Sequence, residues 1–110
     1  PIVREENGLA MSSRNEYLSV ESKKSAAIIY NALTYAIFLL NNGERNSDVI
    51  KREITKKIDR LPAAKIDYIS LSESTSLTEI KGEIDGSILI SMAVFFDGVR
   101  LIDNISYSSD

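Results

Sequence analysis

The fold is decided by the stretch SILISMAVFFDGVRLIDNI, residues 87–105. Ser87–Phe95 is almost continuously apolar, which is typical of a central strand buried on both faces. From Val99 to Ile105 the side chains alternate between two faces at the period of a strand. Asp97-Gly98 between them is the strongest hairpin signal in the chain, because such residues tolerate the positive φ of a two-residue turn. We therefore predict two antiparallel strands joined by a tight hairpin.

A third strand is predicted upstream of this hairpin, at Lys65–Ser72. Its alternating pattern changes phase near Tyr68-Ile69, which indicates a bulge or a strong twist. The polar segment Thr75–Gly86 then leads to the hairpin, and we expect a short helical turn within it at Leu77–Ile80.

Two helices are predicted before the strands. The first begins after Ser19, a good N-cap, and ends near Asn41-Asn42-Gly43, where glycine adopts the left-handed conformation that terminates helices. The second is capped by Asn46 or Ser47 and is ended by Pro62. Apolar residues recur at helical spacing at Ala26, Ile29, Leu33, Ile37 and Leu40, and again at Ile50, Ile54, Ile58 and Leu61. The order predicts an α+β fold with two helices packed on one face of a small three-stranded antiparallel sheet.

Composition narrows the functional classes. The 110 residues are 44% apolar and 26% charged, which favours one globular domain over residues 1–110. A net charge of −3 argues against a nucleic-acid surface, and the absence of Cys and His removes most zinc sites and the commonest general base. The longest apolar stretch, Ala32–Leu40, is too short to span a bilayer, so we expect no membrane association and a cytoplasmic location. The start at Pro1 without Met favours a piece of a longer polypeptide.

A candidate anion site lies near the start of the chain. After an Asn7-Gly8 turn, Ser12, Ser13, Arg14 and Asn15 bring two hydroxyls, an amide and a guanidinium into one loop. Charge-assisted hydrogen bonds from such groups could hold a triphosphate. The residues alone also fit a capped, serine-rich turn in which Arg14 pairs with Glu16 or Glu21 and nothing binds.

Two other functions are open from the residues. Tyr35, Phe38 and Leu39 lie off the apolar stripe of the first helix, so this flank could serve a stand-alone interaction module. Asp97 and Asp103 could serve a carboxylate-based hydrolase, although a turn position and a strand position explain both residues structurally.

Several segments together resemble the C-terminal domain of the pantothenate synthetase (pantoate-β-alanine ligase) family. They are Pro1–Glu5, Asn7–Asn15, Tyr17–Ser19, Gly43–Arg45, Asp67-Tyr68 and Arg100–Asn104, in the family's order along essentially the whole chain. The Met11–Asn15 block is highly specific to that family.

The resemblance implies a function. The family condenses pantoate with β-alanine using ATP, through a pantoyl adenylate and with release of pyrophosphate and AMP. Its fold is a nucleotidyltransferase-type Rossmann domain followed by a smaller, lid-like domain, and this chain is similar to the second only. Full-length members are expected to be homodimers, mainly through the first domain, and to require Mg²⁺.

The resemblance also implies site residues. Met11, Ser12, Ser13 and Arg14 correspond to the family's ATP-binding loop, a counterpart of the KMSKS loop of class I aminoacyl-tRNA synthetases, with Arg14 as its sole cation. Val3 matches the position whose backbone contacts adenine. We expect Arg14 to stabilise the charge that develops on the departing pyrophosphate. The family's HxGH-type signature has no counterpart in a chain without His, and the resemblance places the pantoate and β-alanine pockets mainly upstream, so the isolated chain is expected to be inactive. No residue of this chain is predicted to bind a metal.

Overall fold

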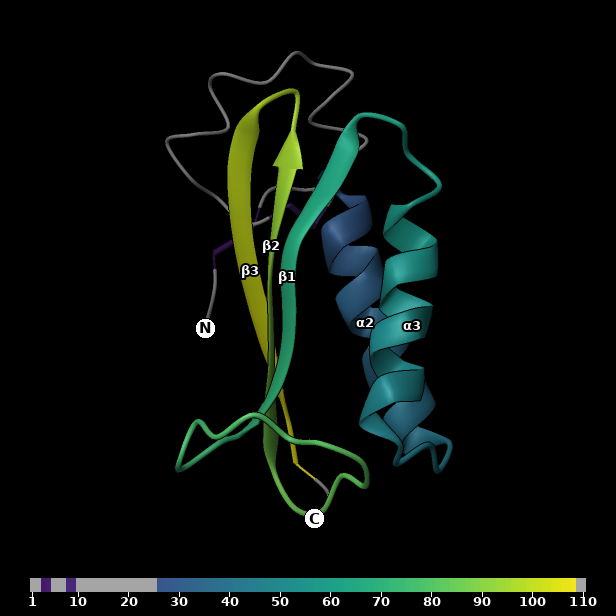
Figure 1. Cartoon of the computed structure of the whole chain (residues 1–110), viewed down its shortest axis with the longest axis vertical. Coiled ribbons are helices and arrows are strands. Elements are labelled where there is room, and N and C mark those ends of the chain that lie inside the picture. Colours follow the sequence, from purple (N-terminus) through teal and green to yellow (C-terminus); the bar gives the residue numbers. More distant parts are fainter. Residues whose placement is uncertain (1–2, 5–7, 10–25, 109–110) are drawn as a thin grey trace.

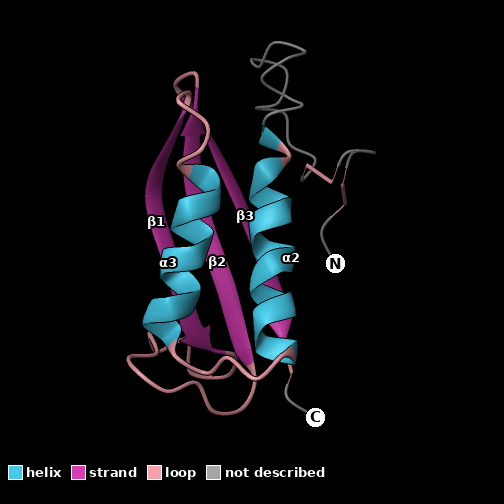
Figure 2. Cartoon of the chain, turned by 90° about the vertical axis from the view of Figure 1, so that its right-hand side faces the viewer, coloured by secondary structure: helices cyan, strands magenta, loops and turns pink. Residues whose placement is uncertain are grey.

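A computed structural model describes residues 3–4, 8–9 and 26–108 of the chain. Two helices and three strands follow one another along it: α2 (Ile28–Asn41), α3 (Ser47–Ile58), β1 (Ala64–Glu73), β2 (Ile88–Phe96) and β3 (Val99–Tyr107). Both helices lie on the same side of the sheet (Figure 1), and the view turned by 90° shows them side by side in front of it (Figure 2). The predicted α+β fold is therefore confirmed.

The sheet is an antiparallel meander in the order β1-β2-β3. Asp97 and Gly98 form the turn between β2 and β3, with φ values of 49° and 81°, and Phe96 pairs with Val99 directly before and after them. Both residues adopt the left-handed conformation that a two-residue hairpin requires. The hairpin prediction is confirmed at the predicted residues.

The first strand and its connection depart partly from prediction. The bulge is confirmed, and the register shifts between Ile66 and Tyr68. The expected helical turn at Leu77–Ile80 is wrong. Glu79 forms an antiparallel bridge with Ser72, and the Ile80 amide donates to the Leu71 carbonyl at 2.8 Å. The segment therefore runs along β1 and satisfies backbone groups on its outer edge, which a helical turn would leave unpaired.

The helix boundaries follow local signals where the structure describes them. Asn46 caps α3, because its side-chain oxygen accepts hydrogen bonds from two amides of the first turn. Gly43 follows α2 with a φ of 98°, as predicted for a left-handed terminator. The predicted cap at Ser19 lies outside the described residues. Leu61 was predicted on the buried face of the second helix, but α3 ends at Ile58 and Leu61 is only partly buried. No helix in the described part of the chain is long and apolar enough to cross a membrane.

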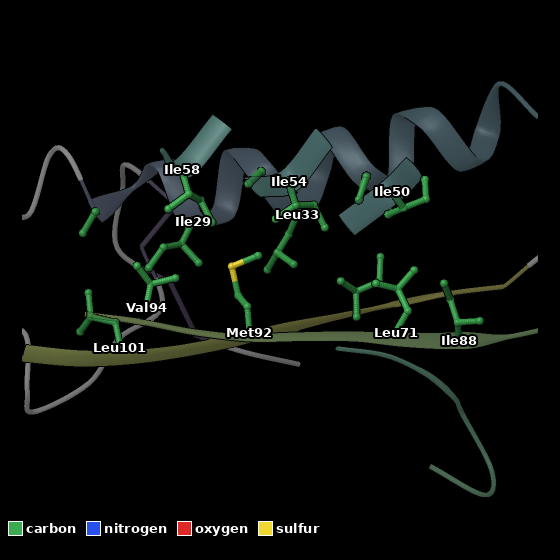
Figure 3. Packing of buried hydrophobic residues seen from close by; sticks show 14 of the residues in the cluster. Ile29, Leu33, Ile50, Ile54, Ile58, Leu71, Ile88, Met92, Val94 and Leu101 are labelled. Carbon is green, nitrogen blue, oxygen red and sulfur yellow. The ribbon is translucent and has the colours of Figure 1, made fainter. Parts of the chain in front are cut away.

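The hydrophobic core lies between the helices and one face of the sheet. Figure 3 shows Ile29, Leu33, Ile50, Ile54 and Ile58 pointing from the helices toward side chains of the sheet, and all five are buried. The sheet contributes Leu71, Ile88, Met92, Val94 and Leu101, which are also buried. The predicted burial of β2 on both faces is only partly correct. Leu89, Ser91 and Phe95, on the face away from the helices, are half-buried, whereas Ala93 on the same face is fully buried.

Candidate functional site

The predicted phosphate loop falls outside the residues that the structure describes. Met11, Ser12, Ser13 and Arg14 therefore remain predictions. Val3 is described, and 67% of its surface is exposed to solvent. The structural information on this site comes from the described residues next to the loop.

Arg4, the residue after Val3, forms a two-pronged ion pair with Asp103. One guanidinium nitrogen donates to Asp103 Oδ2 at 2.6 Å and the other donates to Oδ1 at 3.0 Å. Asp103 lies on the helix-facing side of β3, in register with Met92, and only 3% of its surface is exposed. A buried carboxylate is stable only when it is paired, and the planar fork of an arginine matches its two oxygens.

The same arginine also contacts a turn and a helix. Its Nη1 donates to the Gly8 carbonyl at 3.1 Å, and its guanidinium carbon lies 4.1 Å from the centre of the Tyr30 ring. Tyr30 belongs to α2, so Arg4 joins the N-terminal segment to both layers of the fold. We call Arg4, Gly8, Tyr30 and Asp103 the Arg4 anchor.

Gly8 is required in this anchor for two reasons. Its φ is +95°, a conformation that residues with a side chain rarely adopt. A Cβ at this position would lie 2.5 Å from Cδ2 of Tyr30, far inside van der Waals contact. The predicted turn at Gly8 is confirmed for this residue, and Leu9 directly after it is buried in the main core.

The cation of the Arg4 anchor contacts groups of the protein itself. The donors of Arg4 are directed to Asp103 and Gly8, and its flat face lies against Tyr30. Arg4 is thus a structural partner of Asp103. Arg14, which lies outside the described residues, stays the predicted phosphate cation.

Asp103 was not predicted as part of the ATP site, and Arg4 was named only within a family motif. A signal was present, because Asp103 shares the inward phase of Val99, Leu101 and Ile105 on β3. An acid in the inward phase of a strand has to find a partner on folding. The structure also contradicts Asp103 as a hydrolytic acid, since both its oxygens accept hydrogen bonds from Arg4 and Oδ1 accepts another from the Asn104 amide.

The aromatic flank of α2 is smaller than predicted. Tyr35 and Phe38 stack with ring centres 6.0 Å apart, and the Lys57 ammonium lies 4.4 Å from the Tyr35 ring centre. Leu39 packs against the core, which leaves Phe38 as the exposed member of the flank, with 57% of its surface accessible.

A second ion pair joins α3 to the segment beside β1. Lys51 Nζ lies 2.7 Å from Glu79 Oε2, and this carboxylate also accepts hydrogen bonds from the Ser70 hydroxyl and the Leu71 amide. Burial acts to raise the pKa of Glu79, but these hydrogen bonds and the charge of Lys51 outweigh it and lower the pKa below its ordinary value.

The chain is similar to known proteins of one family. The family model described as Pantoate-beta-alanine ligase matches residues 1–106. The pantothenate synthetase of Clostridium acetobutylicum is 46% identical over 108 residues, and that of Enterococcus faecalis is 49% identical over 107 residues. These alignments cover 98% and 97% of this chain but 38% of each relative. The crystal structure of pantothenate synthetase from Thermus thermophilus superposes with a TM-score of 0.84 at 33% identity, covering 96% of this chain and 37% of that one.

Proposed function

The chain belongs to the pantoate-beta-alanine ligase family, as its motifs predicted, and from this premise we propose that it supplies the ATP-phosphate-binding segment of such a ligase. The complete enzyme would condense pantoate with β-alanine using ATP, through pantoyl adenylate, and would release pantothenate, AMP and pyrophosphate. The match across residues 1–106, which includes the Met11–Asn15 block, carries this proposal. The named relatives are pantothenate synthetases, so a stand-alone interaction module gains no support.

Each site residue has a proposed role. The backbone of exposed Val3 contacts adenine, and Met11, Ser12 and Ser13 bind the phosphates. Arg14 is the catalytic cation. As the pantoate carboxylate attacks the α-phosphorus, negative charge moves onto the leaving pyrophosphate, and a guanidinium held beside it lowers the barrier. The Arg4 anchor supports this assignment. It fixes Arg4 and Gly8, and because Arg4 is bound to Asp103, the next arginine in the sequence, Arg14, is the candidate for the ligand.

We assign Mg²⁺ and the pantoate and β-alanine pockets to parts of the enzyme outside this chain. We assign Mg²⁺, which the family resemblance implies, to ATP and to the rest of the enzyme, and we propose no metal ligand in this chain. The chain spans 38% of the length of its curated relatives, and we assign the pantoate and β-alanine pockets mainly to a Rossmann domain formed by the rest of the enzyme. We propose a cytoplasmic homodimer for the complete protein.

A chimera with the Enterococcus faecalis relative tests the proposal. The 107-residue matching segment of that enzyme is replaced by this chain, and pantoate-dependent exchange of pyrophosphate into ATP is measured. We expect exchange in the chimera and a loss of about hundredfold or more on Arg14→Ala, the scale of removing one charge-stabilising donor. Arg52→Ala, at an exposed arginine on α3, is the matched control and should leave exchange unchanged.

Two results would contradict the proposal. Near-normal exchange by the Arg14→Ala chimera would remove Arg14 from the mechanism. Robust pantothenate formation by the 110-residue chain alone would overturn the assignment of the other pockets to a separate domain, since we expect no turnover and ATP affinity no better than about millimolar.

A further inference from the structure

We propose that Asp103 is a positioning residue for the ATP site, which acts through Arg4 to fix Val3 and Leu9. This inference rests on the proposed function, because it assigns the placement of that site to a residue 99 positions away from Arg4. Asp103 touches no substrate in this proposal. It instead holds in place the backbone of Val3, which we propose contacts adenine.

Asp103 is a rigid attachment point. It sits inside β3, paired in register with Met92 of the central strand, and Met92 is itself fully buried. Its Oδ1 accepts a hydrogen bond from the amide of the next residue at 2.7 Å, which fixes the plane of the carboxylate. A carboxylate held in this way offers its two oxygens to a guanidinium in one orientation only.

Arg4 transmits this orientation to the neighbouring backbone. Its guanidinium is held in three directions, by the carboxylate, by the face of Tyr30 and by the Gly8 carbonyl. Val3 is one peptide unit before Arg4, about 3.8 Å away between Cα atoms, and Leu9 is one unit after Gly8. Fixing Arg4 and Gly8 therefore determines where the backbone lies at Val3 and at Leu9, which is two residues before Met11.

Such placement has a direct effect on ligand binding. The apparent affinity for a ligand falls in proportion to the fraction of molecules whose site is correctly arranged. Without Asp103 both carboxylate hydrogen bonds of Arg4 are lost, and its contacts with Tyr30 and the Gly8 carbonyl alone have to hold the guanidinium. We expect the loss of these charged hydrogen bonds to make correctly placed molecules about tenfold scarcer, and ATP binding at Val3 to weaken by the same factor.

A purely structural ion pair is the competing explanation, and it predicts a different result. Buried ion pairs contribute little net stability compared with apolar replacements, although breaking one partner costs stability throughout the fold. A structural role would therefore lower the stability of the whole chain without moving Val3 and Leu9 in the molecules that remain folded.

Amide spectra of the ¹⁵N-labelled 110-residue chain separate the two explanations. In Asp103→Asn we expect the Val3 and Leu9 amides to shift before any ligand is added, while the Ile54 amide in the core stays in place. With MgATP as the probe, the initial slope of the Val3 shift against ATP concentration should fall about tenfold. Asp67→Asn is the control, because it weakens another arginine–aspartate pair of the sheet region, Arg100–Asp67, whose Arg Nη2 and Asp Oδ2 atoms are 2.9 Å apart.

Unmoved Val3 and Leu9 amides, or an ATP slope no lower than that of Asp67→Asn, would overturn the inference. If Asp103→Asn does not fold, Arg4→Lys is read in its place, since it keeps the charge but loses the two-pronged contact, and unmoved amides there would also overturn the inference. If the Val3, Ser12 and Ser13 amides of the wild-type chain do not shift when MgATP is added, the proposed ATP site is refuted. The ligand-free spectra would still show whether Asp103 positions Val3 and Leu9.

Discussion

Replacing Gly8 by alanine tests the Arg4 anchor with a well-matched internal control. Gly8 and Gly43 have nearly equal φ values, +95° and +98°. A Cβ on Gly8 would lie 2.5 Å from Cδ2 of Tyr30, whereas a Cβ on Gly43 would meet nothing within 4 Å. The two substitutions therefore share the backbone strain and differ in the steric clash.

The difference between the two variants can be worked out from the contacts. The left-handed conformation costs an alanine about 1–2 kcal/mol, and this term is common to both. At Gly8 the Tyr30 ring has to move, which disturbs the stacking of Arg4 on it, at about 0.5–2 kcal/mol, and the hydrogen bond from Arg4 to the Gly8 carbonyl, at about 1 kcal/mol. Gly8→Ala should thus lower the free energy of unfolding by about 1.5–3 kcal/mol more than Gly43→Ala does.

Urea unfolding followed by circular dichroism gives both free energies under identical conditions. In a Tyr30→Ala background the extra cost at Gly8 should disappear, because the atom that causes the clash is gone. Equal losses for Gly8→Ala and Gly43→Ala in the wild-type background would show that Gly8 does not lie against Tyr30, and the anchor as described would be wrong.

Three further changes test other parts of the fold. Asn46→Ala removes the α3 cap and should cost about 1 kcal/mol in urea unfolding, while Asn46→Asp, which keeps an acceptor, should cost little. Ile54→Ala empties a fully buried site and should cost about 2–5 kcal/mol, against less than about 1 kcal/mol for Ile102→Ala at a residue that is 47% exposed; similar losses would mean that the core is misplaced. The folded pKa of Glu79 lies below its ordinary value of 4.5, so its ion pair with Lys51 stabilises the fold above that pH, and this contribution is lost as the pH falls through the lower, folded pKa. Glu79→Gln should therefore reduce the fall in stability between about pH 5 and pH 3, and an unchanged pH profile would exclude this pair as a source of it.

The hairpin turn and the helix ends could be predicted from the sequence, because residues within a few positions of each other determine them. Asp97-Gly98 fits one turn type, and Asn46 and Gly43 satisfy helix ends through contacts a few residues away. The helical turn at Leu77–Ile80 was mispredicted because Glu79 is held by Ser70 and Lys51, which lie 9 and 28 positions earlier in the sequence. No pattern within the segment itself contains that information.

The Arg4 anchor was not predicted, for the same physical reason. The Met11–Asn15 block is contiguous, so its family resemblance is readable in one place. The Arg4 anchor joins four residues from two ends of the chain and one helix, and its partners become neighbours only when the sheet and α2 are packed together. An inward-facing acid on β3 indicated that a partner was needed, but the sequence did not indicate that Arg4 was that partner.

The contact between Arg4 and Asp103 also sets an order of events during synthesis. A ribosome adding about 5–20 residues per second makes Arg4 at least several seconds before the 99-residue interval to Asp103 is complete. Until β3 has emerged and paired with β2, Arg4 has no carboxylate of this kind to bind. The segment that we assign to ATP therefore reaches its final position among the last steps of folding, and a nascent chain cut short before Asp103 could form both helices without ever placing Val3.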